Sequence, residues 1–191
     1  LYTPRRFIAV AGPAAVKPSY VEVPAGVSMQ DLAEYFGEGD VRIVSGDVLS
    51  GEAIGREGFL GFYHNQVSVL KEGHYYEMFG WANPFRGKKF SASRAYPAFL
   101  RCKKKYEMDT NENGGDPPFL MNDTYKKVLP MDIYPLYLFK ACLAGDIEKM
   151  ENLGIYEVIE EDVALCEYVC PSKVEIQNII RQGIDLMMKE M

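Results

Sequence analysis

The stretch Arg6-Phe7-Ile8-Ala9-Val10-Ala11, which is closed by Gly12-Pro13, decides how the first part of the chain folds. It is a short apolar run that stops at two turn-forming residues, and this pattern predicts a β-strand. Residues 20–23 and 41–44 alternate between apolar and polar side chains, as strands with one buried face do. These segments together predict a small sheet.

One helix and one hairpin are expected in the same part of the chain. Ser28 can cap a helix, with Asp31 three residues on, and apolar residues follow at helical spacing. Residues 66–70 and 75–79 flank a short turn and predict a hairpin. A few strands with a single short helix form an α+β arrangement, and a small β-grasp-like mixed sheet is its natural form. We assign this domain to residues 1–91.

The remainder predicts a long connection over residues 92–130 and a helical domain over residues 131–191. Turn-forming residues fill positions 109–118, and the basic run 101–105 is interpreted as a solvated loop or a subunit contact. In the last part, apolar residues recur with a period of 3.6. Helices are expected over 132–142, 146–153 and 162–166, and from Ser172 onward, where Glu175 completes a capping box. The expected fold class is therefore α+β, a β-grasp-like mixed sheet followed by a helical domain.

The composition is that of a globular chain, with 48% hydrophobic and 25% charged residues. The formal net charge is −6 and the pI about 5.1, whereas nucleic-acid-binding domains are usually basic, so no nucleic-acid partner is expected. No apolar run approaches the about 18 residues of a spanning helix. Because the chain begins with Leu1, we expect it to be a piece of a longer protein.

The pattern of cysteines predicts buried structural residues rather than disulfides or metal ligands. Cys102, Cys142, Cys166 and Cys170 are too few and too unevenly placed for a disulfide framework, which favours a reducing compartment. Cys166-x3-Cys170-Pro171 matches the end of the bacterial ferredoxin run Cys-x2-Cys-x2-Cys-x3-Cys-Pro. The two preceding ligand positions, however, are Val163 and Glu160. We therefore expect no cluster and no metal here, and interpret Cys166 and Cys170 as small buried residues.

Other candidate groups also have structural explanations. His64 and His74 have no ligand partner at metal-binding spacing, so a solvated or hydrogen-bonded role is expected for each. The acidic run Glu160-Glu161-Asp162 favours the start of a helix. Residues 45–51 lack both the GxGxxG fingerprint and the Walker lysine and are interpreted as a turn between strands. No catalytic or metal residue is expected, and cofactor-binding residues are left open.

Several stretches in order along the chain resemble one family. They are Ile43-Val44-Ser45-Gly46-Asp47-Val48-Leu49-Ser50-Gly51, Gly61-Phe62-Tyr63-His64-Asn65-Gln66-Val67-Ser68-Val69-Leu70, Phe79-Gly80-Trp81, Val128-Leu129-Pro130-Met131-Asp132-Ile133-Tyr134-Pro135, and Glu160-Glu161-Asp162-Val163-Ala164-Leu165-Cys166-Glu167-Tyr168-Val169-Cys170-Pro171-Ser172-Lys173. The sequence is similar there to the family formed by the A subunit of the Na+-translocating NADH:quinone reductase complex, and it resembles the C-terminal part of that subunit.

The resemblance implies a place in a six-subunit respiratory complex that passes electrons from NADH to ubiquinone and exports sodium. The A subunit would be a peripheral member on the cytoplasmic side of the bacterial inner membrane. Residues 1–91 would be a β-grasp domain of the soluble-ligand-binding type. Residues 131–191 would resemble the iron–sulfur domain of the related Rnf subunit, without its cluster ligands.

The resemblance also implies how activity is divided within the complex. The complex is the enzyme, a translocase, and this chain alone is expected to be inactive. No cofactor is expected in this chain, because NADH, flavins, iron–sulfur and ubiquinone belong to the complex as a whole. Its partners would be the other subunits, with ubiquinone as a further candidate, and its role would be assembly and quinone-proximal structure. Two alternatives stay open: an iron–sulfur electron carrier, and a free-standing β-grasp module that binds a small ligand.

Overall fold

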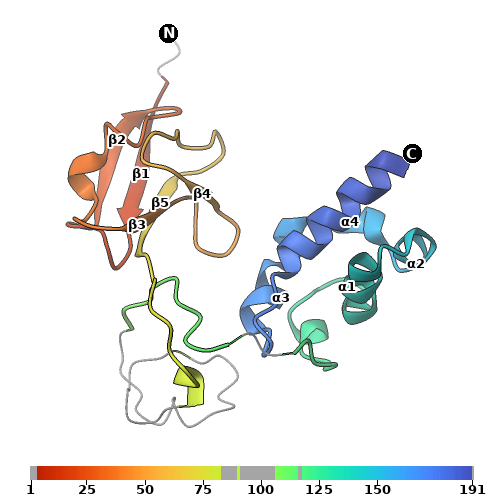
Figure 1. Ribbon diagram of the computed structural model, residues 1–191. Coiled ribbons are helices and arrows are strands. Elements are labelled where there is room, and N and C mark those ends of the chain that lie inside the picture. The colour runs from red at the N-terminus through yellow and green to blue at the C-terminus, as the bar shows by residue number, and fades with distance from the viewer. Residues whose placement is uncertain (1–3, 83–89, 91–105, 116–117, 191) are drawn as a thin grey trace. The chain divides into compact units, whose positions relative to one another are not determined.

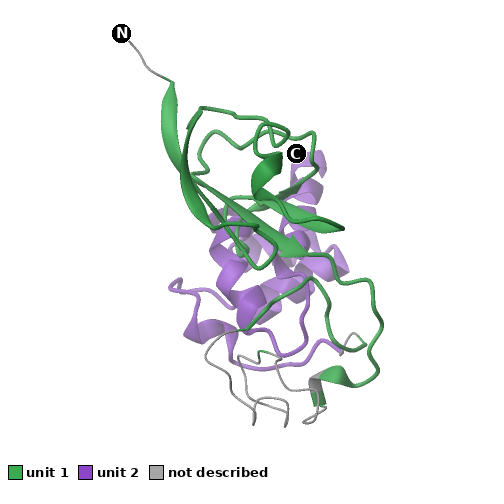
Figure 2. Ribbon diagram, turned by 90° about the vertical axis from the view of Figure 1, so that its left-hand side faces the viewer, with its two compact units in different colours: residues 1–115 green, residues 116–191 purple. Residues whose placement is uncertain are grey.

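The computed structural model describes residues 4–82, 90, 106–115 and 118–190 (Figure 1). The chain forms two compact units, Leu1–Gly115 and Asp116–Met191 (Figure 2). We refer to them as the sheet unit and the helical unit. Cys102 and the basic run 101–105 lie outside the described residues.

The sheet unit is built on a five-stranded mixed sheet with the order β2-β1-β5-β3-β4. Its strands are β1 (Arg5–Ala11), β2 (Ser19–Pro24), β3 (Val41–Ser45), β4 (Glu52–Ile54) and β5 (Gln66–Lys71). The pair β1–β5 is parallel, and the pairs β1–β2, β3–β5 and β3–β4 are antiparallel. Together with the helices of the other unit, this sheet confirms the α+β class, while the β-grasp form stays a prediction.

One face of the sheet carries the core of this unit. Ile8 and Val10 on β1 are buried, as are Val67 and Val69 on β5. Their spacing of two residues follows from the alternation of side chains along a strand. The sequence therefore correctly predicts the strands that begin near positions 6, 20, 41 and 66.

The helix predicted after Ser28 is wrong in length. Only a short 3-10 helix, η1 (Ala33–Tyr35), forms there. The surrounding backbone bonds to other segments instead of continuing a helix: the Met29 amide donates to the Gly58 carbonyl at 2.9 Å, and the Gly37 amide donates to the Ala14 carbonyl at 2.8 Å. The apolar residues of this stretch, Met29, Leu32 and Phe36, still enter the core of the sheet unit.

The predicted hairpin at 66–79 is also wrong. β5 already pairs with β1 on one side and β3 on the other, so neither edge is left for a following strand. Residues 72–75 instead contact the segment around Thr110, whose side-chain oxygen accepts from the Gly73 amide at 2.9 Å. The Tyr75 hydroxyl donates to Asp109 at 2.7 Å. The short strand β4 has too few residues for its alternation to be recognised.

In its described residues, the helical unit contains four α-helices around a second core. They are α1 (Pro135–Ala144), α2 (Ile147–Asn152), α3 (Ala164–Val169) and α4 (Ile176–Glu190). Short 3-10 helices η4 (Tyr125–Lys127), η5 (Ile155–Glu157) and η6 (Glu160–Val163) connect to them. Phe139 of α1 and Ile180 of α4 are fully buried. A Cβ at Gly183 would lie 2.7 Å from Cys142 Sγ, so glycine permits the close packing of α4 on α1.

The helix boundaries follow local chemistry, with one correction. α1 begins at Pro135, whose fixed φ suits a first helical position, rather than directly after Asp132. Asp146 caps α2 by accepting from the Lys149 amide at 3.1 Å. The capping box expected at Ser172 is wrong, because the Ser172 hydroxyl accepts from the Leu120 amide at 3.1 Å. α4 begins four residues later, where Glu167 Oε2 accepts from the Gln177 amide at 3.0 Å.

The two units meet in sequence between Gly115 and Asp116, inside the predicted connection 92–130. Tyr125 and Leu129, at the end of that predicted connection, are part of the helical core. The domain boundaries at 91 and 130 themselves stay predictions. Within the described part of the chain, no helix has both the length and the apolar character needed to cross a membrane.

Candidate functional site

A polar cluster at the end of β3 brings together residues from stretches 43–51 and 61–70, two of those that resemble the family. Ser45 is 2% exposed, and its Oγ accepts from the Gly61 amide at 3.0 Å. The same Oγ lies 2.7 Å from His64 Nδ1. Both hydrogen bonds form when Ser45 donates to Nδ1 and the His64 proton is on Nε2. We call Ser45, Gly61 and His64 the β3 cluster.

Close approach of the backbone holds the imidazole of the β3 cluster. A Cβ on Gly61 would lie 2.8 Å from His64 Nδ1, which is too close for any side chain. A Cβ on Gly46 would lie 3.3 Å from the ring, and the φ of +100° at Gly46 disfavours other residues. Glycine at these two places therefore lets the ring lie against the backbone.

Asp47 lies next to the β3 cluster, but its carboxylate stabilises the turn that follows β3. Its Oδ1 accepts from the Ser50 amide at 2.8 Å and from the Leu49 amide at 2.7 Å. These backbone hydrogen bonds lower the pKa of Asp47, with the bond to Ser50 the larger cause, and the nearby His64 lowers it further. Residues 45–51 join β3 to β4, as the turn interpretation predicts. The carboxylate is committed to the turn by these hydrogen bonds, and the Ser45 hydroxyl is buried.

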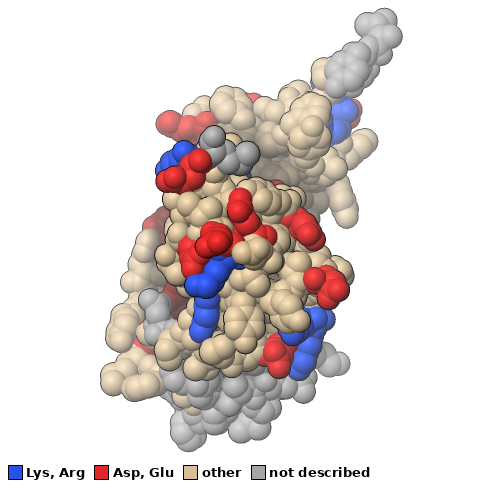
Figure 3. All heavy atoms as spheres, turned by 90° about the vertical axis from the view of Figure 1, so that its right-hand side faces the viewer, with Lys and Arg blue, Asp and Glu red and all other residues tan. Residues whose placement is uncertain are grey.

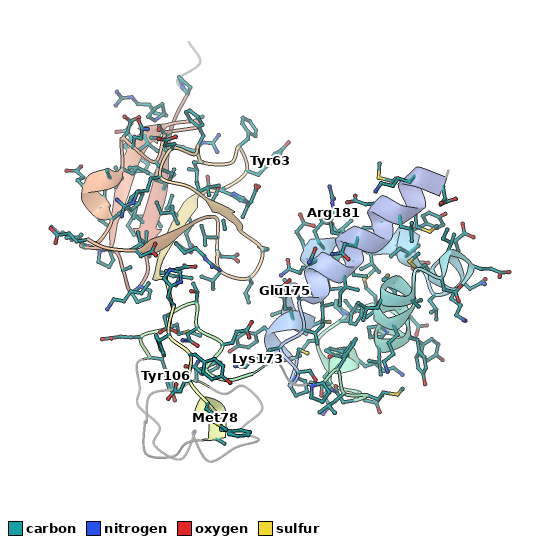
Figure 4. The ribbon with its side chains drawn as sticks, in the orientation of Figure 1. Tyr63, Met78, Tyr106, Lys173, Glu175 and Arg181 are labelled. Carbon is teal, nitrogen blue, oxygen red and sulfur yellow. The ribbon has the colours of Figure 1, made fainter. Side chains whose placement is uncertain are left out.

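Aromatic side chains cover the outside of the loop that carries His64. The rings of Phe62 and Tyr63 meet edge to face with centroids 5.1 Å apart, and they are 64% and 89% exposed. Arg6 lies 5.3 Å above the Phe62 ring and donates to the Phe62 carbonyl at 2.5 Å. Figure 4 shows Tyr63 on this loop, at the surface of the sheet unit. The cluster thus has a satisfied polar interior and an exposed aromatic and cationic exterior.

The second histidine forms a surface pair that the sequence does not indicate. His74 Nε2 lies 2.6 Å from Asp40 Oδ2, and both side chains are 70% exposed. Thirty-four residues separate them, so only the fold brings them together. An exposed pair of this kind contributes little stability.

In the helical unit, Cys166 and Cys170 lie against Tyr125. Cys166 is 1% exposed and Cys170 is 6% exposed, which confirms that both are buried. The Tyr125 hydroxyl lies 3.1 Å from Cys170 Sγ, and Cys166 Sγ lies 4.0 Å from the Tyr125 carbonyl oxygen. Burial raises the pKa of Cys166 to about 11 and raises that of Tyr125 well above its usual range. A protonated thiol such as that of Cys166 is a poor nucleophile and a poor metal ligand.

Val163 and Glu160, which stand where the ferredoxin pattern has cysteines, lie in different environments. Val163 is fully buried in the helical core. Glu160 Oε1 lies 2.9 Å from Nη1 of Arg181, which is on the exposed side of α4 (Figure 4). Asp162 Oδ2 accepts from the Ile159 amide at 3.2 Å and so caps η6, in agreement with a helix-start role for the acidic run. Within the described residues, no group of three or more His, Cys, Asp or Glu side chains is placed to hold a metal ion.

Comparison with known proteins covers both units. A family model described as the NQRA C-terminal domain matches residues 7–55. The chain is 41% identical to the A subunit of the Na(+)-translocating NADH-quinone reductase of Vibrio atlanticus (strain LGP32), over 97% of this chain and 42% of that protein. The corresponding proteins of Vibrio anguillarum and Klebsiella pneumoniae subsp. pneumoniae are also 41% identical, over 100% and 97% of this chain. The resemblance to the A subunit is confirmed.

The match is to a part of these relatives. The chain spans about 42–43% of the length of the corresponding proteins from Vibrio and Klebsiella. The region covered by the family model includes Ser45 and Asp47 but ends before His64. The similarity to the relatives extends over both the β3 cluster and the cysteine pair, so the two units correspond to one continuous region of those proteins.

Sequence reasoning found the parts of these clusters but not their contacts. Ser45 and His64 both lie in stretches quoted for the family resemblance, yet a separation of nineteen residues gave no sign of a hydrogen bond. The signal that could have found it is the glycine near each, because Gly46 and Gly61 leave room for a ring. Tyr125 carries no motif at all and is recognised only from its burial beside the thiols.

Proposed function

We propose that this chain is a part of the A subunit of a Na+-translocating NADH:quinone reductase, and that its activity exists only within that complex. The observation that carries the proposal is similarity at about 40% identity over 97–100% of the chain, through both units. The substrates NADH and quinone and the transport of sodium come from the names of the relatives. The complex would be the oxidoreductase, and this chain would be one of its non-catalytic parts.

The proposed contribution is structural. In the β3 cluster the hydroxyl, the imidazole and the Gly61 amide satisfy one another, and Ser45 is 2% exposed. In the helical unit Cys166 and Cys170 are buried, and burial raises the pKa of the Cys166 thiol to about 11. The Ser45 hydroxyl and the two cysteine thiols are all buried, which supports a chain without its own cofactor, with flavins and iron–sulfur centres on other subunits. Its partners would be the other members of a six-subunit complex.

The location follows from the same proposal. The chain would lie at the cytoplasmic side of the bacterial inner membrane, attached through partner subunits. Ubiquinone is a further candidate for contact, and the exposed pair Phe62–Tyr63 beside Arg6 supports it, because flat rings can stack on a quinone. A photoreactive quinone analogue should then label residues near position 62, whereas labelling confined to other subunits would exclude this contact.

Purification from native membranes tests the proposal as a whole. The chain, carrying an affinity tag, should co-purify with the other subunits, and the purified complex should reduce quinone with NADH in a sodium-dependent way. The isolated chain should be colourless and should not oxidise NADH. NADH oxidation by the isolated chain, or a visible chromophore bound to it, would contradict the proposal, and the chromophore would favour the electron carrier.

A further inference from the structure

The outward side of α1 in the helical unit is aromatic and aliphatic instead of charged. Tyr134, which precedes the helix, Tyr137 and Leu143 are 56%, 55% and 57% exposed. Lys140 is the only charged residue among the ten of α1. A helix that is apolar all round is normally covered on all sides, and the other side of α1 already packs into the core. Its outward side therefore has the character of a contact surface.

A groove runs beside this side of the helix. Its volume is about 170 Å³. The lining residues are Met121, Asn122, Asp123, Tyr125, Lys126, Tyr134, Pro135, Leu136 and Tyr137. Tyr134 and Tyr137 meet edge to face at 6.3 Å, and Lys126 Nζ lies 4.8 Å from the centre of the Tyr134 ring. Contacts of this kind restrict the motion of the rings, which reduces the entropy lost when a partner binds.

Lysines border the rings at both ends. Lys126 lies over Tyr134, and Lys140 follows Tyr137 by one turn, with its Nζ 5.8 Å from the centre of the Phe119 ring. From Tyr134 to Lys140 the helix rises about 9 Å at 1.5 Å per residue. Among the described residues, neither lysine forms an ion pair with a carboxylate. Asp123 is the one acidic residue in the lining of the groove.

These lysines contrast with the charge of the unit that carries them. Residues 116–191 contain seven Lys and Arg against fourteen Asp and Glu. Figure 3 shows acidic side chains gathered over the middle of one face, with fewer basic ones among them. Two of the seven cations, Lys126 beside Tyr134 and Lys140 beside Phe119, have no carboxylate partner among the described residues. This local reversal of sign favours a partner that supplies carboxylates there.

We propose that the surface formed by Met121, Lys126, Tyr134, Tyr137 and Lys140 binds an apolar segment of another protein of the complex, whose carboxylates meet the two lysines. We call it the α1 surface. The inference rests on the proposed function, because the partner is then another subunit of the reductase. Tyrosines are frequent at the energetic centre of protein interfaces, and the lysines select the partner by charge.

Two other occupants fit the α1 surface less well. In a symmetric contact with a second copy, the same surface faces itself, so lysines would meet lysines. An anionic membrane attracts lysines, but it repels a unit in which carboxylates outnumber cations two to one. An acid-bearing protein segment satisfies the rings and the lysines together.

Zero-length cross-linking tests the chemistry of the partner directly. A carbodiimide joins a lysine amine to a carboxylate only when the two are in contact. Applied to the purified reductase complex, it should link Lys126 or Lys140 to an Asp or Glu of a different subunit, which mass spectrometry of the peptides identifies. Links from these lysines only to this chain, or to a second copy of it, would overturn the proposal.

Variants test the rings and the lysines separately. Tyr134→Ala with Tyr137→Ala, and Lys126→Glu with Lys140→Glu, should each lower the fraction of complexes that retain the chain at least about tenfold, because tyrosines at the centre of an interface and charges paired across it contribute strongly to binding. Matched controls are Tyr156→Ala and Lys189→Glu, which are exposed elsewhere in the same unit and should leave retention unchanged. Unchanged melting temperatures show that the variants fold. Retention equal to wild type in both double variants would overturn the proposal.

The outcomes separate this inference from the function on which it rests. If the wild-type chain does not co-purify with a reductase, the proposed function fails. If it does, and the two double variants co-purify equally well, only the α1 surface is refuted. If the wild-type chain sediments with phosphatidylglycerol vesicles and Lys126→Glu with Lys140→Glu abolishes this, the occupant is lipid and the protein partner is excluded.

Discussion

Each unit contains residues from the stretches that resemble the A-subunit family, and the two units stabilise these residues by different interactions. In the sheet unit, Ser45, Gly61 and His64 meet through directed hydrogen bonds of 2.7 and 3.0 Å. In the helical unit, Cys166 and Cys170 are held mainly by burial, with one oxygen–sulfur contact of 3.1 Å to Tyr125. A buried polar group left without a partner is costly, whereas a missing sulfur leaves only a small void. The comparison implies that one hydroxyl in the sheet unit contributes about as much to the free energy of unfolding as two thiols in the helical unit.

The largest effect is expected at Tyr125, the residue on which the thiols pack. Its side chain is fully buried and meets Phe139 edge to face at 5.5 Å. Tyr125→Ala should lower the free energy of unfolding by about 3–5 kcal/mol, as removal of a buried ring does. Tyr125→Phe keeps the ring, loses the contact to Cys170, and should cost about 1 kcal/mol.

Chemical denaturation followed by circular dichroism measures this loss. The exposed Tyr137 supplies the matched control, and Tyr137→Ala should change the free energy of unfolding by less than about 0.5 kcal/mol. Equal losses for Tyr125→Ala and Tyr137→Ala would show that the helical core does not depend on this ring.

The next effect concerns the hydroxyl of the β3 cluster. Ser45→Ala leaves the Gly61 amide and His64 Nδ1 without their partner, so a loss of about 2–3 kcal/mol is expected. Ser50 is exposed and its hydroxyl lies 3.3 Å from Asp47, so Ser50→Ala is the matched control and should cost less than about 0.5 kcal/mol. Hydrogen exchange at β3 and β5 localises the effect. Exchange that rises equally in both variants would mean that the buried Ser45 hydroxyl stabilises the fold no more than the exposed Ser50 hydroxyl does.

A smaller effect is expected for the cysteine pair. Replacing Cys166 and Cys170 together by Ala should lower the free energy of unfolding by about 1–3 kcal/mol, the range for small buried groups. Turnover per assembled complex should be retained, because no cluster depends on these thiols. A large loss of turnover with an unchanged melting temperature would instead favour the electron carrier.

The sequence predicted what depends on local pattern. The apolar run at 6–11, the alternation at 20–23 and 41–44 and the 3.6-residue period after Pro130 predicted strands and helices that the structure contains, and with them the α+β class. Buried cysteines were predicted from the incomplete ferredoxin pattern, and Cys166 and Cys170 are indeed buried. Each of these signals lies within a few residues of the feature it describes.

The wrong predictions concern features that depend on contacts with segments distant in the sequence. The hairpin after β5 failed because β1 and β3 already occupy both of its edges. The capping box at Ser172 failed because Leu120, fifty-two residues earlier, takes the serine hydroxyl. The pair Ser45–His64 could not be seen for the same reason, since its hydrogen bond depends on how the loop after β4 returns to β3. Local propensity is overridden wherever a tertiary partner competes for the same donor or acceptor.

The smallest effect is expected in how stability and thiol reactivity in the helical unit depend on pH. Burial raises the pKa of the Cys166 thiol from 9.0 to about 11, and that of Cys142 likewise to about 11. The folded state binds these protons more tightly than the unfolded state, so the stabilisation is complete below about pH 9 and is lost as the pH rises through about 11. At pH 8 the folded chain should therefore alkylate at Cys142 and Cys166 far more slowly than the urea-unfolded chain, with peptide mapping to distinguish the thiols. If Cys166 is modified as fast in the folded as in the unfolded chain, the thiol is accessible and the packing explanation of the helical unit is wrong.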